Sequence, residues 1–265
     1  MMDGRELEDY MQFAVSAVEA VGPIALRYFR CRVEVSDKAT GGFFDPVTAA
    51  DREIEAALRA AIEERYPGHG IIGEEDGVKV GVDARSWVID PIDGTRAFIT
   101  GMPAWGIMLG LVEAGEPCLG VVHQPFLGET FCGDGGRAWL RAAGGSVEMR
   151  ARATRDIGDA VLYCTHPSMF SGDERKAFER VADACRLSRY GGDCYAYCLL
   201  ALGEIDMVVE NGLQPYDILP LIPILEGAGA VVTDWQGRRP LRGGRVAVAA
   251  TPELHSGLLA KLVGG

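Results

Sequence analysis

The spacing of apolar residues changes near residue 70, and this change limits the folds that the chain can adopt. Before it, apolar side chains recur at helical spacing over residues 6–30. A second helix is predicted from about Thr48 to Arg65, and Pro67 with Gly68 ends it. Beyond it, short apolar runs between glycine, proline and acidic turns predict strands at 70–73, 86–90, 106–113, 117–122, 129–132 and 137–140. The first half of the chain is therefore expected to be α+β.

The pattern changes again after about residue 145, where predicted strands and helices alternate. Strands are expected near 160–164, 205–210, 230–234 and 245–249, and helices near 173–186, 193–203, 216–228 and 252–262. Such alternation is typical of an α/β arrangement. No proline- or serine-rich linker separates the halves, so we predict one domain over 1–265. Its sub-halves, about 1–145 and 146–265, are expected to share a core and to enclose a cleft.

Charge and composition exclude several classes of function. No apolar run reaches the roughly 18 to 20 residues of a membrane-spanning helix, and the acidic N-terminus lacks the segments of a secretory signal. The seven cysteines form no CxxC pair, which favours buried thiols in a reducing compartment. A net charge of −12 argues against a nucleic-acid surface. We therefore predict a cytoplasmic protein that binds neither nucleic acid nor membranes.

Carboxylates stand at the ends of two predicted strands. Glu74 follows the first strand, and Asp90 ends the second, with Asp93 three residues further on. Pro91 stiffens the turn between the two aspartates, and the carbonyl of Ile92 is then free to point inward. These are hard oxygen ligands in a constrained geometry, which suits Mg²⁺ or Mn²⁺ better than zinc.

A glycine and a hydroxyl follow these carboxylates. If a helix begins at Gly94 and Thr95, its free N–H groups form a place where phosphate can bind. Metal ions beside a phosphate site favour hydrolysis of a phosphate ester, with one ion activating water and another stabilising the leaving oxygen. The alternative is two consecutive turns in which the aspartates bond to their own backbone.

Two further acids have a structural and a functional interpretation. Asp51 completes a helix-capping signature with Thr48, and this role is compatible with an outer-shell contact to a metal ion. Asp217 falls in the first turn of a helix that begins at Pro215, where a carboxylate is favoured by the helix dipole. Spacing alone favours the simple N-terminal acid.

Several motifs together resemble those of one known family. They are DPVTAAD at 45–51, GEE at 73–75, WVIDPIDGT at 87–95 and PYD at 215–217. This set is similar to that of the inositol monophosphatase-like phosphatases, which are Mg²⁺-dependent and lithium-sensitive, and the match covers nearly the whole chain. The resemblance implies a layered αβαβα sandwich of the inositol monophosphatase and fructose-1,6-bisphosphatase type. It also implies a homodimer.

The resemblance assigns the carboxylates to metal ions. Asp90 would bridge two ions, with Glu74 and the Ile92 carbonyl on the first. Asp93 and Asp217 would bind the second. The expected cofactor is therefore Mg²⁺, two or three ions per site, with Mn²⁺ as a possible substitute. The metal and phosphate site would belong to the first half of the chain, and the substrate side to the second.

The resemblance also implies catalytic roles. Thr95 and Glu74 would position and deprotonate the attacking water, while Asp93, Gly94 and Thr95 would hold the phosphate. Asp51 would act through water on a weaker third ion. Lys38 and the loop after it would form a flap over the site.

The substrate is suggested by two departures from the inositol-cleaving members and by one stretch that resembles another branch of the family. Asp193 and Tyr216 stand where those members carry Thr or Ser and Trp, and the stretch 190-YGGDCYAY-197 resembles the histidinol-phosphate phosphatase branch. Asp193 and Glu210 could pair with the ammonium and imidazole of histidinol. The structural alternative is that Asp193 caps the helix at 193–203.

We therefore expect a Mg²⁺-dependent phosphomonoesterase that acts on a small phosphorylated substrate, first of all L-histidinol phosphate in histidine biosynthesis. Inositol-1-phosphate and a nucleotide 3′-phosphate are the alternatives within the family. A regulatory binding protein on the same fold is the alternative of another class.

Overall fold

The computed structural model describes residues 3–31, 35–37 and 46–264. Two helices form one outer layer of the molecule, α1 (Gly4–Tyr28) and α2 (Ala49–Arg65). Asp3 caps the first, and its carboxylate accepts from two backbone N–H groups. A small two-stranded sheet, β1 (Val35–Asp37) with β2 (Pro46–Thr48), leads into α2. Both long helices predicted from the sequence are thus present.

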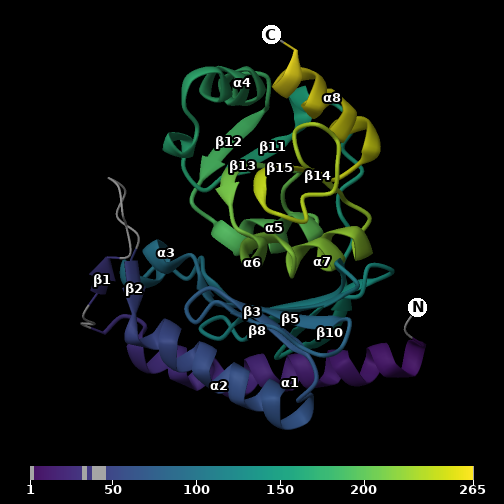
Figure 1. Cartoon of the computed structure of the whole chain (residues 1–265). Helices are drawn as coiled ribbons and strands as arrows, with labels where there is room; N and C mark the ends of the chain where they lie inside the picture. The colour runs from purple at the N-terminus through teal and green to yellow at the C-terminus, as the bar shows by residue number, and fades with distance from the viewer. Residues whose placement is uncertain (1–2, 32–34, 38–45, 265) are drawn as a thin grey trace.

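An eight-stranded sheet lies against these helices (Figure 1). From edge to edge its strands are β10 (Gly145–Glu148), β9 (Ala138–Ala142), β8 (Glu129–Gly133), β7 (Glu116–Gln124), β6 (Gly106–Glu113), β5 (Arg85–Asp93), β3 (Gly70–Gly73) and β4 (Val78–Lys79). Neighbouring strands are antiparallel except β3 and β5, which are parallel. Because β3 and β5 run in the same direction, their C-terminal ends lie at the same end of the sheet.

A five-stranded sheet forms the other half. Its order is β12 (Leu187–Tyr190), β11 (Val161–Cys164), β13 (Met207–Leu213), β15 (Gly244–Ala249) and β14 (Val231–Thr233). Strand β11 is parallel to both of its neighbours, and β15 is antiparallel to both of its own. Two short 3-10 turns, Ile157–Asp159 and Pro167–Met169, flank β11.

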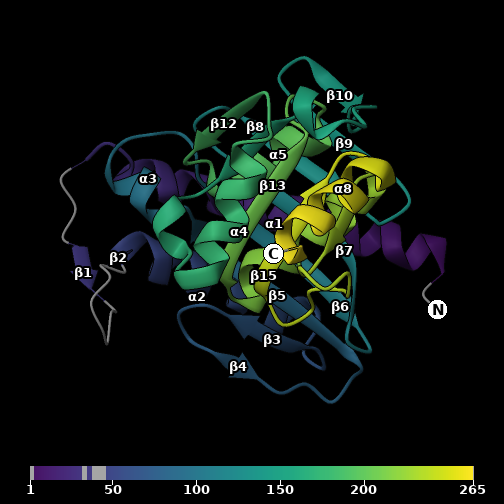
Figure 2. The ribbon, with the colours of Figure 1, turned by 90° about the horizontal axis from the view of Figure 1, so that it is seen from above.

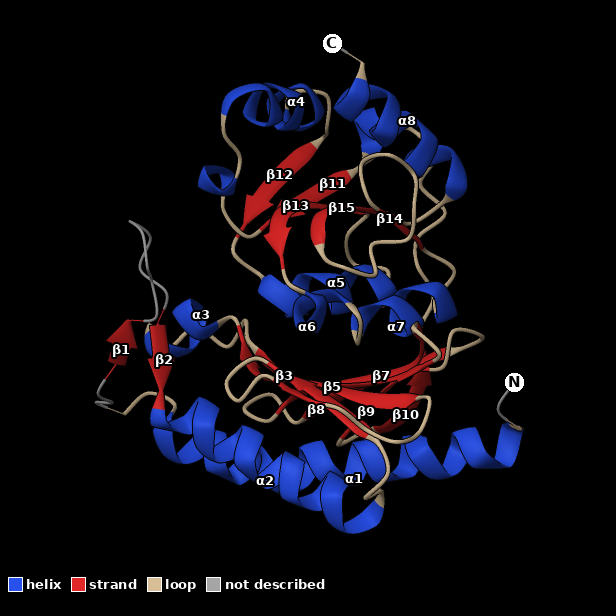
Figure 3. Cartoon of the chain, in the orientation of Figure 1, coloured by secondary structure: helices blue, strands red, loops and turns tan. Residues whose placement is uncertain are grey.

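Helices complete the layers (Figure 3). Between the sheets lie α5 (Asp193–Ala201), α6 (Pro215–Ile218) and α7 (Leu221–Gly227). Over the outer face of the smaller sheet lie α4 (Gly172–Ala182) and α8 (Pro252–Val263), which are side by side when seen from above (Figure 2). A short helix, α3 (Thr95–Ile99), follows β5. The order of layers is αβαβα, which confirms the predicted fold class.

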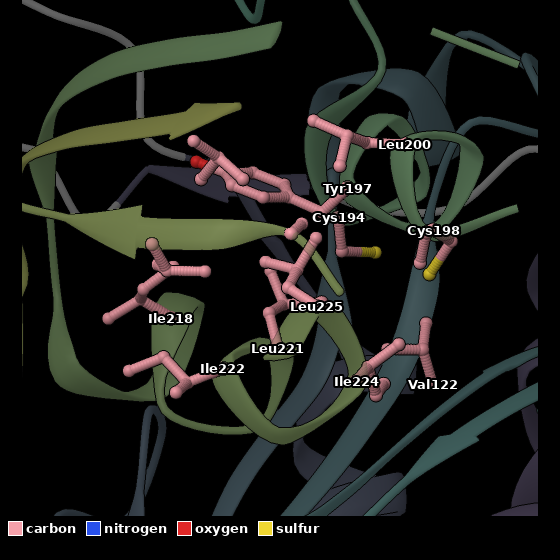
Figure 4. Close-up of a cluster of buried hydrophobic side chains, with 14 of the residues drawn as sticks. Val122, Cys194, Tyr197, Cys198, Leu200, Ile218, Leu221, Ile222, Ile224 and Leu225 are labelled. Atoms are coloured by element: carbon pink, nitrogen blue, oxygen red, sulfur yellow. The ribbon is translucent and has the colours of Figure 1, made fainter. Parts of the chain in front are cut away.

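One hydrophobic cluster joins the two halves. Val122 of β7 lies beside Ile224 of α7, and Leu221 and Cys198 belong to the same buried group (Figure 4). At Gly120 the fit is so close that a Cβ atom would overlap the carbonyl oxygen of Pro220. The predicted organisation as a single domain over 1–265, with sub-halves of about 1–145 and 146–265, stays a prediction that this shared core supports.

Several elements differ from the sequence-based expectation. The helix predicted at 216–228 is two helices, because Pro220 lacks the N–H that a continuous helix would use. The helix predicted at 173–186 ends at Ala182. Strands β4, β10 and β12 were not predicted, since they lie at sheet edges and are mostly exposed, which leaves no alternating pattern to recognise. Among the described residues, no helix is long and apolar enough to cross a membrane.

Candidate active site

A cavity of about 400 Å³ opens beside the ends of β3 and β5. The residues that line it are Glu74, Asp90, Ile92, Asp93, Gly94, Thr95, Arg96, Thr165, Met169, Asp193, Cys194, Tyr197, Glu210, Gly212, Leu213, Gln214, Tyr216 and Asp217. Both halves of the chain contribute to this lining. Among the described residues, all those predicted for the site line this cavity except Asp51.

The local fold explains how the acids converge. Strands β3 and β5 are parallel neighbours. Glu74, which follows β3, and Asp90, near the end of β5, therefore lie at the same end of the sheet. The pairing of β5 with β6 shifts register between Asp90 and Asp93, so the strand is irregular where the two aspartates stand. Asp217 arrives from the other half, where it is the third residue of α6 and accepts from the backbone N–H of Gln214 at 2.7 Å. The predicted first-turn role of Asp217 and its place in the cavity are therefore compatible.

Three of these carboxylates form a compact group. One oxygen from each of Asp90, Asp93 and Asp217 lies within 4.8 Å of the others. Asp90 is 1% exposed, and its Oδ1 is buried without a hydrogen-bond partner among the described residues. Burial raises the pKa of Asp90 well above its usual value, and the nearby charges of Glu74, Asp93 and Asp217 raise it further.

This arrangement fits a divalent cation. A buried carboxylate oxygen without a partner is costly, and like charges at this spacing repel one another. A bound cation with oxygen ligands removes both costs at once. The carboxylates that line the cavity match the preference of Mg²⁺ and Mn²⁺ for oxygen ligands, and Ile92, whose carbonyl is a predicted ligand, lines the same cavity.

The turn after β5 requires glycine. Gly94 has φ of +85°, and a Cβ there would lie 2.8 Å from Ala104 O and 3.2 Å from Asp193. A helix does begin here, but α3 has only five residues, so its dipole is weak. The Thr95 hydroxyl donates to the carbonyl oxygen of Ile92 at 3.1 Å. Its own oxygen lone pairs therefore stay available to accept from another group.

Asp193 stands next to Asp93 and does not cap its helix. It is the first residue of α5, with φ of +45°, and Gly192 occupies the capping position without a side-chain bond. Burial raises the pKa of Asp193 to about 6, while Thr165 and Arg96 act in the lowering direction. The next residue, Cys194, donates its backbone N–H to the carboxylate of Asp93. The structural alternative for Asp193 is therefore wrong.

Glu210 is a buried carboxylate at the inner wall of the cavity. It is 3% exposed and accepts from Thr165 N at 2.9 Å, Thr165 Oγ1 at 2.6 Å and Tyr197 Oη at 3.1 Å. Burial raises its pKa to about 7, opposed by the hydrogen bonds from Thr165. The geometry holds this carboxylate in one orientation.

Asp51 lies behind the cavity. It forms the predicted capping box with Thr48, whose N–H and hydroxyl lie 2.8 and 2.6 Å from Asp51 Oδ2. Asp51 is 1% exposed, and its charge contributes to the raised pKa of Asp90. The capping role is confirmed, and an outer-shell role stays a prediction. Lys38, predicted in a flap, falls outside the described residues.

Comparison with known proteins identifies the family. The sequence profile described as "Inositol monophosphatase family" matches residues 6–264. The chain belongs to this family. It is accordingly a metal-dependent phosphatase that hydrolyses phosphate monoesters. The resemblance seen in the sequence motifs is thereby confirmed.

Three similar proteins illustrate the range of this family. Bifunctional phosphatase IMPL2 of Arabidopsis thaliana chloroplasts is 40% identical over 236 residues, which cover 88% of this chain and 66% of that protein. A histidinol-phosphatase of Chlorobaculum parvum is 32% identical, over 96% of this chain and 97% of that one. The solved structure of an inositol monophosphatase from Zymomonas mobilis has a TM-score of 0.85 and 36% identity, covering 96% and 98% of the two chains.

Other cavity residues of this family member were not foreseen from the sequence. Thr165 directly follows strand β11, as Glu74 follows β3, so the position after a strand was a usable signal. Arg96 follows the acidic motif and brings a cationic side chain to the cavity. Leu213 and Met169 look like ordinary apolar residues in the sequence, and only the folded chain brings them to the cavity.

Proposed function

We propose that this protein is a Mg²⁺-dependent phosphatase whose principal substrate is L-histidinol phosphate. The group formed by Asp90, Asp93 and Asp217, with its buried oxygen that lacks a hydrogen-bond partner, supports the metal requirement. The substrate assignment is supported by two further carboxylates in the same cavity, at Asp193 and Glu210.

The acids would divide the metal ions among them. Asp90 would bind both ions. Glu74 and the carbonyl of Ile92 would also bind the first ion, and Asp93 and Asp217 would also bind the second. When bound, Mg²⁺ acidifies a water molecule and stabilises the leaving oxygen, and Mn²⁺ can take its place. The third ion predicted near Asp51 stays a prediction.

The residues around the acids would orient the reaction. The Thr95 hydroxyl donates to Ile92, so its oxygen can accept from the attacking water and aim it at phosphorus. Glu74, which lines the same wall, would receive the proton of that water. The backbone N–H groups at Gly94 and Thr95, together with Asp93 through its metal ion, would hold the phosphate. No covalent phosphoenzyme is needed in this scheme.

Two carboxylates would recognise the cationic part of the substrate. Asp193 is partly exposed to the cavity and is ionised above a pKa of about 6, so it would face the ammonium or imidazole directly. Glu210 is held by three hydrogen bonds and would contribute charge and shape from deeper in the wall. A neutral cyclitol gains nothing from Asp193, because this partly exposed carboxylate would then lose water without a cation to replace it.

The test is a panel of substrates: histidinol phosphate, inositol-1-phosphate, fructose-1,6-bisphosphate and adenosine 3′,5′-bisphosphate. We expect kcat/KM to be highest for histidinol phosphate by at least about tenfold, since one charge-assisted contact contributes about 1.5–3 kcal/mol. A higher value for inositol-1-phosphate would favour the alternative that the Zymomonas mobilis relative supports.

A regulatory binding role is separated from catalysis by one variant. Asp93→Asn is expected to abolish metal-dependent phosphate release while leaving the outer surface unchanged. Full biological activity of Asp93→Asn would indicate the binding role. The homodimer also stays a prediction, which sedimentation equilibrium would decide.

A further inference from the structure

A buried ion pair lies behind the loop that carries Glu74. Glu55 and Arg59 stand one turn apart on α2, with side-chain exposures of 0% and 13%. Arg59 Nε and Nη2 both lie 2.8 Å from Glu55 Oε1. A carboxylate wholly removed from water is costly unless charges and hydrogen bonds compensate it. The remaining contacts of the pair show what supplies that compensation.

Those contacts go to the backbone of the loop after β3. The N–H of Glu75 donates to Glu55 Oε2 at 2.8 Å, and the N–H of Asp76 donates to Oε1 at 3.0 Å. Arg59 donates to the carbonyl oxygen of Gly77. The ion pair therefore fixes the backbone of three consecutive residues, directly after the acid that lines the cavity.

The residue before Glu74 fits closely against the same pair. A Cβ on Gly73 would overlap Glu55 Oε1 and would lie 2.6 Å from Arg59 Nη2. Only glycine lets the carboxylate approach the end of the strand this closely. The N–H of Gly73 also donates to Gly77 O at 3.0 Å and closes the turn. The chain is thus held on both sides of Glu74.

We propose that Glu55 and Arg59 are positioning residues that set the place of Glu74 and, through it, the affinity of the acidic cluster for divalent ions. This inference rests on the proposed function, in which Glu74 is a metal ligand. Groups that orient metal ligands typically change metal affinity by about 10- to 100-fold when they are removed. Here the orientation would be transmitted through the backbone N–H groups that follow Glu74, and neither Glu55 nor Arg59 itself lines the cavity.

The test is the variant Glu55→Gln. Its amide group turns an N–H₂ toward backbone donors, so at least one of the loop contacts is lost. The affinity of the purified protein for Mn²⁺, followed by the EPR signal of free Mn²⁺, is expected to fall by about tenfold. Activity at saturating Mg²⁺ should return close to that of the parent, which a general structural defect would not allow.

A matched control lies on the same helix. Glu63 is 50% exposed and pairs with Lys79 at 2.9 Å, so Glu63→Gln removes an ion pair without touching the loop after β3. Its Mn²⁺ affinity should equal that of the parent. Equal losses in the two variants would overturn the positioning role.

Two further variants separate the possible failures. If Glu74→Gln leaves Mn²⁺ binding unchanged, the proposed metal role of Glu74 is wrong and the inference falls with it. If Glu74→Gln weakens binding but a folded Glu55→Gln does not, only the positioning role is wrong. Should Glu55→Gln not fold, Arg59→Lys keeps the charge and loses the planar fork, and an unchanged Mn²⁺ affinity there overturns the proposal.

Discussion

Replacing Asp193 by asparagine tests the substrate assignment through one proposed contact, that between this carboxylate and the cationic part of the substrate. Asparagine keeps the shape of the side chain and tolerates the positive φ of +45° at this position, which alanine does not. The substitution removes a charge that is present above a pKa of about 6. At pH 7.5 the comparison is therefore between an ionised carboxylate and a neutral amide in the same place.

The size of the effect follows from the surroundings. Asp193 is partly buried, so a cation that contacts it is only partly screened, and a hydrogen bond to a charged group contributes about 1.5–3 kcal/mol. That range corresponds to about 10- to 150-fold in KM for histidinol phosphate. Inositol-1-phosphate offers no cation, so its KM should change by less than about threefold.

One complication is cancelled by comparing the two substrates. The charge of Asp193 also raises the pKa of Asp93, so its removal alters the acidic cluster for every substrate alike. The measured quantity is therefore the ratio of kcat/KM for histidinol phosphate to that for inositol-1-phosphate. Asp173→Asn, an exposed acid in the first turn of α4, is the matched control. An equal loss on both substrates would refute the reasoning and show that Asp193 does not recognise the cation of the substrate.

Two further predictions concern stability. Removing divalent ions with EDTA should lower Tm, because the clustered carboxylates then repel one another. Adding Mg²⁺ at about 100 times its Kd should raise the free energy of unfolding by about 2.7 kcal/mol. A Tm that does not respond to Mg²⁺ would contradict the metal site. Burial lowers the pKa of His255 below its usual value of 6.5. As pH falls, His255 therefore binds a proton in the unfolded chain before it does so in the folded one, and the free energy of unfolding decreases. His255→Gln should therefore lose less unfolding free energy than the parent between pH 7.5 and 5.5 in urea titrations, and an equal loss would show that His255 is not responsible.

The acidic cluster could be predicted because its information is local. Glu74 and Asp90 stand at the ends of apolar runs, and a parallel strand pair turns that position in the sequence into proximity. Asp217 could not be placed by spacing, since its first-turn position also explains it. Its proposed metal-binding role came only from the motif resemblance, and the fold places Asp217 in the same cavity as Glu74 and Asp90.

The supporting groups could not be predicted, for a different reason. Glu55 sits on an amphipathic helix and looks like any charged helix residue, yet it is wholly buried against the loop after β3. Thr165 and Tyr197 come from separate elements and meet only at Glu210. Such contacts depend on how helices and sheets pack, and packing leaves no periodic signal in the sequence.

The three clustered aspartates come from two neighbouring layers of the fold, two from β5 and one from α6. A ribosome must therefore synthesise most of the chain before it adds Asp217. Further residues must be added before Asp217 leaves the exit tunnel. Any shortened product that stops ahead of Asp217 contains the residues of the eight-stranded sheet but lacks the third carboxylate of the acidic cluster. Phosphatase activity would therefore require translation of nearly the entire message, and an incomplete nascent chain would be inactive.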